Sequence, residues 1–291
     1  MEALRRRIEA RVMSLSGLAL GQIDYEHPEG DPGLFGPDSM PWEVHSDFTS
    51  MLVGGIASLL LQMLHPLALA GVWDHSNFRQ DMLGRLRRTG QFVAGTSFAP
   101  TASADWLIDK VRTIHLKVTG TAADGRRYAA SDPALLTWVH VAEVSCFLAG
   151  YLRYLNPQLS GAEQDRYYAE IALVAERLGA TDVPKSRQAV ADYLDAMRPQ
   201  LVCDERTREI CRILLNAPAP SRSAVPISRL FMQAGIDLLP AWTQQQLGLQ
   251  QAAWQRPLIR AGVHSLAPIL RWAVRNGASH RSRKRMGLPP R

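Results

Sequence analysis

The chain has 291 residues, of which 46% are hydrophobic and 21% are charged, and its formal net charge is +6. These values fit a folded globular protein of one large domain or two small ones, and they exclude a disordered, collagen-like or disulfide-stapled chain. The three cysteines, Cys146, Cys203 and Cys211, are few and have no C-x-x-C spacing, which indicates a reducing compartment, so we expect a cytoplasmic protein.

The first 75 residues contain a charged helix, an irregular segment and a long apolar run. Residues 1–15 have the pattern of an amphipathic helix and lack the apolar centre and cleavage site of a signal peptide. Residues 20–41 are rich in proline and glycine and predict an irregular segment. Residues 51–73 carry no charged side chain while His65 is neutral, so they are long enough in principle to cross a bilayer. Glycines and His65-Pro66 interrupt this run, which favours a buried pair of helices broken near His65-Pro66 over a single membrane span.

The rest of the chain is dominated by helical signals. Asp132-Pro133 opens a helix to about Tyr154, and Ser160 to Glu163 form a capping box for a helix that ends at Gly179. Further helices are expected from Ser186 to Met197, from Cys203 to Leu215, and from Ile227, Leu239-Pro240 and Ala252 onward. Asp124-Gly125 lies between two short runs and predicts a β-hairpin near residues 118–131. No internal repeat is present, and we predict one all-α domain over residues 1–279.

The last twelve residues concentrate positive charge. Residues 280–291 hold five arginines and lysines and no acid, so the rest of the chain is nearly neutral. Such a segment is typical of a solvated, flexible tail. Weak contact with an anionic membrane surface is the alternative interpretation. No nucleic-acid-binding motif occurs elsewhere, and we expect no nucleic-acid partner.

His115 lies beside an apolar helical stripe. Leu107, Val111, Ile114 and Val118 repeat at helical spacing. Arg112 and His115 lie one turn apart in a neighbouring row, which places a guanidinium and an imidazole on one surface. Two interpretations remain open from the residues alone. His115 is either a hydrogen-bonded core histidine, or a metal or haem ligand with an anion-binding arginine beside it.

Three further places in the chain combine polar side chains with apolar surroundings. His65 is either a core histidine bonded to a carbonyl freed by Pro66 or a residue that faces a cofactor. His140 follows Trp138 and is either a buried histidine oriented by a neighbour or a distal group. Arg85 and Thr89 share one helix face, which is either solvated or able to hold a carboxylate, a phosphate or a bound oxygen species.

Several familiar kinds of active site have little support. His45-Ser46-Asp47 has the H-x-D spacing of some non-haem iron sites, but here Asp47 is better placed to cap the next helix. No Ser-His-Asp order, H-E-x-x-H motif, Walker loop or strand-linked G-x-G-x-x-G is present. Most catalytic classes with a sharp sequence signature therefore have no support.

An ordered set of motifs resembles one protein family. The motifs are Gly54-Gly55, Leu60-Leu61-Gln62, His65-Pro66, Arg85-Leu86, Arg88-Thr89, Val111-Arg112, His115, Gly120, Asp124-Gly125, Tyr128, Asp132-Pro133, Leu136 and Trp138-Val139-His140. Together they are similar to the rubber oxygenase (latex-clearing protein) catalytic-domain family, which also contains the MpaB-like oxygenases. The resemblance runs from about residue 42 to about residue 248.

The resemblance implies a globin-like all-α core around a b-type haem. It implies that His115 is the iron ligand and that Arg112 is placed to pair with a haem propionate. The family's R-x-x-x-T pair falls on Arg85 and Thr89, near the haem or the substrate. Arg88 and His140 would be further residues of the cofactor pocket.

The sequence also departs from the rubber oxygenases. Their active-site glutamate lies upstream of the arginine pair, whereas no glutamate occurs here between Glu43 and Glu143. Their possible distal lysine corresponds to Arg88, whose guanidinium does not ligate iron. A secretion signal is also missing, so we infer that polyisoprene is not the substrate. Arg85 and His65 become the polar candidates for the catalytic, distal side.

Three functional hypotheses follow. The first is a haem-b-dependent oxidoreductase that uses dioxygen or peroxide on a small or medium apolar substrate, isoprenoid or lipid-like in character. The second is a non-catalytic haem carrier or gas sensor. The third is a haem-free helical protein that associates with lipid or membranes through residues 51–73 and the basic tail.

Overall fold

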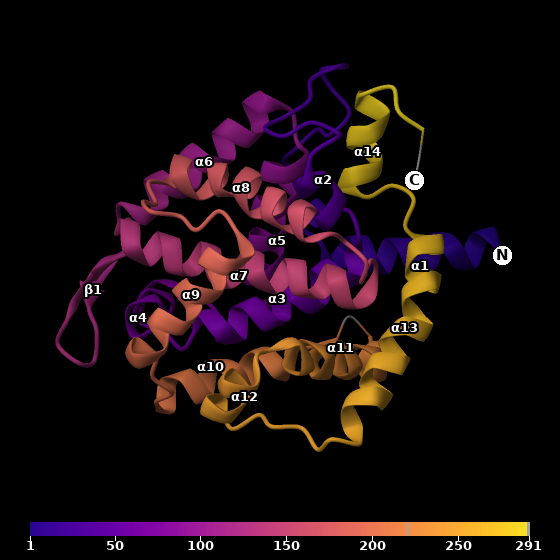
Figure 1. The fold of residues 1–291 in the computed structure, drawn as a ribbon. Coiled ribbons are helices and arrows are strands. Elements are labelled where there is room, and N and C mark those ends of the chain that lie inside the picture. The colour runs from indigo at the N-terminus through magenta and orange to yellow at the C-terminus, as the bar shows by residue number, and fades with distance from the viewer. Residues whose placement is uncertain (220, 290–291) are drawn as a thin grey trace.

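The computed structural model describes residues 1–219 and 221–289. Within them the chain forms fourteen α-helices, three short 3₁₀ turns and one two-stranded hairpin, which confirms the prediction of an all-α fold with a short β-hairpin. Figure 1 shows helices α3 and α7 in the middle of the molecule and the hairpin projecting from one end.

The elements follow one another with short connections. The N-terminal half contains α1 (Glu2–Leu15), η1 (Gly17–Leu20), α2 (Met40–His45), α3 (Phe48–Gln62), α4 (Pro66–His75), α5 (Met82–Phe98), α6 (Thr101–His115), β1 (Thr119–Thr121), β2 (Arg127–Ala129) and α7 (Pro133–Tyr154). The C-terminal half contains α8 (Gly161–Leu178), α9 (Arg187–Met197), η2 (Arg198–Gln200), α10 (Glu205–Leu215), η3 (Arg222–Ala224), α11 (Val225–Leu238), α12 (Ala241–Leu247), α13 (Gln255–Ala273) and α14 (Ala278–Arg285).

Helices α3 and α7 form the centre of the core because glycines allow their backbones to meet. A Cβ atom on Gly54 would lie 2.8 Å from the Cys146 carbonyl oxygen, and one on Gly150 would lie 2.6 Å from the Ser50 carbonyl oxygen. Trp138, which is fully buried, donates from its indole nitrogen to the Gln62 carbonyl at 3.4 Å. The main apolar cluster joins these two helices to residues of α4, α10, α11 and α13.

The apolar run at residues 51–73 is a bent pair of helices, as predicted. Helices α3 and α4 meet at 103°, and Pro66 occupies the first turn of α4, where its missing N–H costs nothing. By length and apolar composition, α7 could cross a membrane, and so could the bent pair if it counted as one span. In this structure α7 is largely buried between neighbouring helices, as the central helix of a folded core is.

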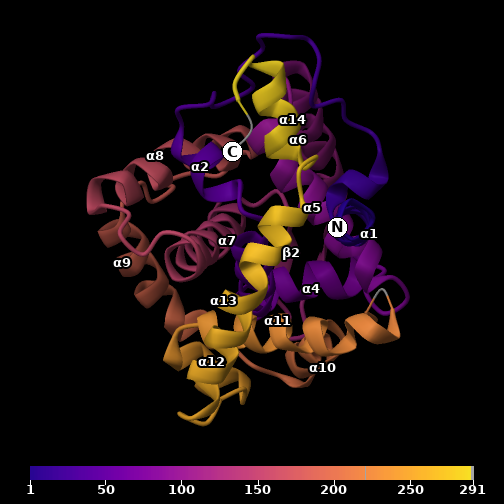
Figure 2. The same ribbon diagram turned by 90° about the vertical axis from the view of Figure 1, so that its right-hand side faces the viewer.

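Helices α5 and α6 form a hairpin of helices on one side of the core. They pack against each other, and α5 also packs against η1 and α14 while α6 packs against α8. Their contacts with α3 and α7 are sparse by comparison. Figure 2, which views the molecule nearly along α7, shows α10 to α13 on the opposite side of the core.

Local signals placed several helix ends correctly. Asp132 caps α7 by accepting the Leu135 N–H, and Ser160 with Glu163 forms the expected capping box of α8. Gly179 ends α8 in the left-handed region at φ 108°. The hairpin has Gly120 opposite Tyr128, and Gly125 takes φ 85° at its tip.

The basic C-terminal segment differs from the flexible tail that we expected. Residues 278–285 form α14, and Arg285 is only 2% exposed. Its guanidinium donates to the carbonyls of Tyr25, at 2.8 Å, and Asp31, at 2.7 Å, and Ser282 donates to the Phe98 carbonyl at 2.7 Å. The irregular segment at 20–41 has backbone carbonyls without helical partners, and the arginine satisfies two of them. Residues 290 and 291 lie outside the described part.

Candidate functional site

His115 ends α6 on the inward face of that helix. Leu107 and Ile108 on the same face are buried, and Val111 and His115 are partly buried. Neither ring nitrogen of His115 has a hydrogen-bond partner among the described residues, and Nδ1 is fully buried. Burial lowers the pKa of His115, so its ring is neutral at neutral pH, which is the form that binds a metal.

The outer residues of the same helical turn lie at the surface. Ile114 is 49% exposed, which corrects the expectation that it belongs to the buried stripe. Helix α6 ends at His115, and no neighbouring helix covers its outer side there. Arg112 is also exposed, and no described carboxylate pairs with it. It lies beside the inward face, where it is available to an anion.

Arg85 and Thr89 lie one turn apart on α5, as the sequence predicted. Arg85 donates from Nη1 to the Ser76 hydroxyl at 2.9 Å. Burial, with a smaller contribution from the charge of Arg88, lowers the pKa of Arg85 to about 10, so it stays cationic at neutral pH. Thr89 is partly buried, and its hydroxyl has no described partner. Arg88 is exposed and lies 3.6 Å from Asp81, with which it forms an ion pair.

The C-terminal end of α4 connects the arginine to the histidine. Ser76, which follows α4, holds Arg85, and His75 Nε2 donates to the carbonyl of Thr119 at 3.1 Å. The structure therefore brings Arg85 and Thr119, which lies four residues after His115, to the same end of α4.

His65 lies at the other end of α4. Its Nδ1 accepts the N–H groups of Leu67, at 3.3 Å, and Ala68, at 3.4 Å, so the ring caps the helix. Its ring lies 5.8 Å from that of Trp138, and burial lowers its pKa to about 4. The ten residues of α4 span about 15 Å. The structure thus separates His65 from Arg85 and gives it a structural task other than the carbonyl bond that we considered.

His140 and Glu143 lie one turn apart inside α7. His140 is 8% exposed, its Nε2 is buried without a partner, and burial lowers its pKa to about 4. Glu143 has no described hydrogen-bond or ion-pair partner, and burial raises the pKa of its carboxyl to about 7. The sequence did not single out Glu143 as a site residue. The signal that could have singled it out is an acid in the middle of an otherwise apolar 22-residue helix.

The H-x-D motif is structural. His45 lies with Nδ1 2.7 Å from the Ser97 hydroxyl and Nε2 2.8 Å from the Tyr167 hydroxyl, so both ring nitrogens are occupied. Asp47 caps α3 through the Ser50 N–H and also pairs with Arg271 at 2.7 Å. Across the described residues, no group of three or more histidine, cysteine, aspartate or glutamate side chains could hold a metal ion. A haem iron does not need such a group, because a single axial histidine holds it.

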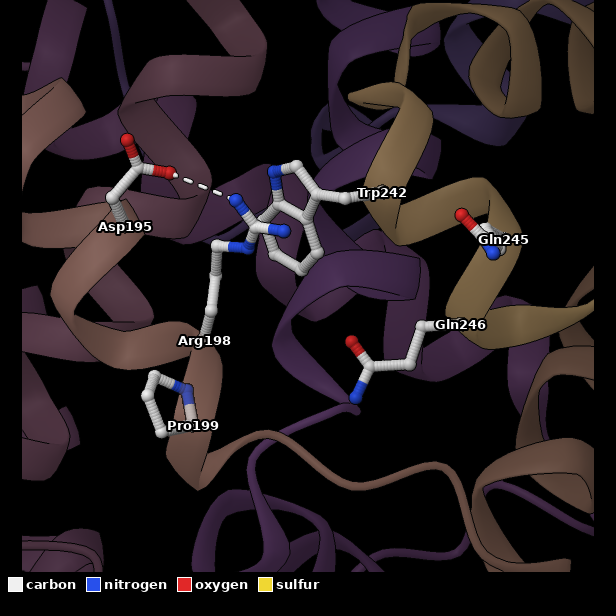
Figure 3. A pocket seen from close by; sticks show the side chains of 6 residues that line it. All are labelled: Asp195, Arg198, Pro199, Trp242, Gln245 and Gln246. Atoms are coloured by element: carbon white, nitrogen blue, oxygen red, sulfur yellow. Dashed lines mark hydrogen bonds and ion pairs between the residues drawn. The ribbon is translucent and has the colours of Figure 1, made fainter.

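A surface pocket lies away from all of these residues. It has a volume of about 650 Å³ and lies between the end of α9, η2 and α12. Figure 3 shows Arg198 beside the ring of Trp242, with a hydrogen bond to Asp195 and with Gln245 and Gln246 opposite. The pocket contains no histidine, cysteine or unpaired acid, so it offers no evident catalytic group.

The comparison with protein families identifies the chain. Residues 42–272 match the model of the family described as "ER-bound oxygenase mpaB/B'/Rubber oxygenase, catalytic domain". The chain belongs to this oxygenase family. The match extends beyond the predicted limit near residue 248 and includes most of α13. No curated protein and no solved structure matches the chain.

Proposed function

We propose that this oxygenase domain depends on haem b and acts on a small or medium apolar molecule, isoprenoid or lipid-like in character, with dioxygen or peroxide as the oxidant. The observation that carries the proposal is His115. It is a neutral, partly buried imidazole with both nitrogens unpartnered, at the inward face of a helix. Such a ring fits an axial haem ligand because a buried polar atom otherwise has a hydrogen-bond partner.

The surrounding residues fit the other needs of a haem. Leu107, Ile108 and Val111 give α6 an apolar inward face, on which Leu107 packs directly against Gly95 of α5. Arg112 is free to pair with a propionate at the edge. Haem, when bound, supplies the iron at which the oxidant is activated.

The chain's own side chains would orient the reactants. Arg85 uses one of its donors on Ser76 and has no carboxylate partner, so it can place positive charge and further N–H donors beside a bound oxidant. Thr89 adds a hydroxyl on the same face. His65 is occupied as a helix cap, and we therefore assign the distal polar role to Arg85.

The test is an absorption spectrum of the protein purified from haem-supplemented cells. The wild type should show a Soret band, and His115→Ala should lose it. His75→Ala is the matched control, because His75 lies at the same end of α4 and should retain the band. An H115A protein with full haem content, or a wild type that never binds haem, would overturn the proposal.

The second candidate is a non-catalytic haem carrier or gas sensor. The unpartnered nitrogens of His140 favour it, since a second histidine could close the sixth position of the iron. This candidate predicts a Soret band that does not respond to carbon monoxide and no substrate turnover. A band that shifts with carbon monoxide supports the oxygenase instead.

We also propose a cytoplasmic location. Cys146, Cys203 and Cys211 are all free thiols, as is typical of proteins in a reducing compartment. The membrane-associated alternative loses support, because Arg285 in the basic segment is buried within the protein.

A further inference from the structure

Two polar side chains in the middle of the molecule have nothing to bind. His140 and Glu143 are a turn apart on α7, and neither ring nitrogen of His140 nor the carboxyl of Glu143 has a partner among the described residues. Buried polar groups in folded proteins are hydrogen-bonded in the great majority of cases. The buried Nε2 of His140, with the partly accessible and unpartnered carboxyl of Glu143 one turn away, therefore indicates a binding partner that is not part of the chain.

The two side chains belong to one stripe of α7. Leu136, His140, Glu143 and Phe147 follow each other at intervals of three or four residues, so they share a face. A second stripe contacts α3 at Cys146 and Gly150, and a third packs on α8 in the cluster around Tyr167. The stripe of His140 and Glu143 lies between these two, and the ring of its Phe147 lies 5.3 Å from the His45 ring of α2.

The neighbouring titratable groups cannot satisfy this pair. Tyr167 of α8 donates to His45 Nε2, because Ser97 already donates its hydroxyl proton to the Val93 carbonyl and so accepts from His45 Nδ1. Cys146, the next titratable residue on α7, is buried, and its thiol is a weak partner. Helix α3 contributes Gly54 and Gly55 opposite Phe147 and no charged group.

Solvent reaches parts of the two central helices near the pair. Gly55 and Leu59 on α3 and Val139 and Glu143 on α7 are partly accessible, although both helices are central. Helix α5 packs on its own hairpin partner α6 more than on α3 or α7. The partly accessible residues Gly55, Leu59 and Val139 are apolar.

We propose that His140 and Glu143 form the polar end of a binding site for an uncharged apolar molecule that carries one hydroxyl group. A hydroxyl donates one hydrogen bond and accepts others, so it can donate to the Glu143 carboxyl and accept from the N–H of neutral His140. A ligand carboxylate is disfavoured, because it would meet the carboxyl of Glu143 in a buried place. The inference deepens the proposed function, since it gives the apolar substrate one polar handle.

The experiment is a calorimetric titration of the purified protein with two ligands of equal size. 1-Decanol can donate a hydrogen bond, whereas methyl nonyl ether has the same number of heavy atoms and cannot. The wild type should bind the alcohol about tenfold more tightly, the value of one hydrogen bond to a buried polar group. Glu143→Leu and His140→Phe should each reduce that preference to about threefold or less.

Two control variants keep the test decisive. Glu143→Gln retains an acceptor oxygen and should keep the preference for the alcohol, which separates binding from loss of fold. Thr243→Val removes another buried, unpartnered hydroxyl, in α12, and should leave both affinities unchanged. Equal affinity of the wild type for alcohol and ether overturns the proposal, and so does an unchanged preference in both E143L and H140F.

A third ligand excludes a cation site. Decylamine should bind the wild type more weakly than 1-decanol, and tighter binding of the amine would overturn the proposal in favour of an ionised Glu143. The Soret band of the same samples is recorded in parallel. A wild type without haem that still prefers the alcohol refutes the proposed function and supports this inference. A wild type that binds haem but does not prefer the alcohol supports the proposed function and refutes this inference.

Discussion

Replacing Glu143 by glutamine should remove a loss of stability that the wild type suffers as the pH rises. Burial raises the pKa of this carboxyl from 4.5 to about 7. Between these values the unfolded chain has released the proton and the folded protein retains it, so the free energy of unfolding falls as the pH increases through this window. The difference between the two pKa values corresponds to about 3 kcal/mol. Glutamine has a similar shape and does not ionise, so the variant lacks this pH-dependent loss of stability.

The assay is urea denaturation of both proteins from pH 4.5 to pH 8, followed by circular dichroism. The histidines titrate alike in both proteins and cancel in the comparison. The variant should gain on the wild type between pH 4.5 and pH 7, by about 3 kcal/mol in total, and the difference should be constant above that range. Glu163→Gln, at an exposed capping box that lowers the pKa of its carboxyl, should show no such gain. A difference that does not change with pH would refute the raised pKa of the unpaired Glu143 carboxyl.

Three further predictions test other parts of the structure. Gly54→Ala should destabilise the protein by about 1–3 kcal/mol in urea denaturation, because its Cβ would lie 2.8 Å from the Cys146 carbonyl oxygen. Gly55→Ala should destabilise it much less, because the nearest atom to its Cβ would lie at 3.8 Å. Equal losses of stability in the two variants would contradict the close contact of α3 with α7. Burial lowers the pKa of His45 to about 3 and that of His140 to about 4. The free energy of unfolding should therefore fall as the pH drops below 6.5, because the unfolded chain takes up protons there before the folded protein does. His45→Gln should shift the midpoint of acid unfolding to lower pH, and an unchanged midpoint would argue against a neutral, buried His45. Arg285→Gln should speed amide hydrogen exchange throughout α14 while leaving α7 unchanged, and full protection of α14 in the variant would show that other contacts hold it.

Sequence patterns predicted the elements whose boundaries depend on nearby residues. The Ser160 capping box, the Asp132-Pro133 start and the Asp124-Gly125 turn each act within a few residues, and the structure has all three where expected. The docking of α14 could not be predicted in this way. Arg285 is buried because the carbonyls of Tyr25 and Asp31, which are distant in the chain, accept hydrogen bonds from its guanidinium. A run of charges taken alone predicts a solvated segment.

The candidate site was predicted in part. Helical spacing predicts that Arg85 and Thr89 share one face of their helix and that His115 faces inward, and the structure agrees with both. The exposure of Ile114 depends on where α6 ends, which its apolar spacing does not reveal. Glu143 was not singled out, because the sequence shows an acid inside an apolar helix but does not show which side chains face it. Its raised pKa depends on how the surrounding helices bury it, which only the packed fold reveals.

The β-hairpin offers a place to attach a reporter close to His115. Its stem is held to α4 by the hydrogen bond from Tyr128 to Asp74 at 2.6 Å and by that from His75 to Thr119. Its tip at residues 123–126 is exposed, and Gly125 has no neighbouring atom within 4 Å of where a Cβ would be. Since the stem of the hairpin is anchored and its tip is not, a fluorophore or short peptide inserted at residue 125 would lie beyond the end of α6 without disturbing the packing of that helix. Energy transfer from that position to a bound porphyrin would then give an optical measure of cofactor occupancy in the intact protein.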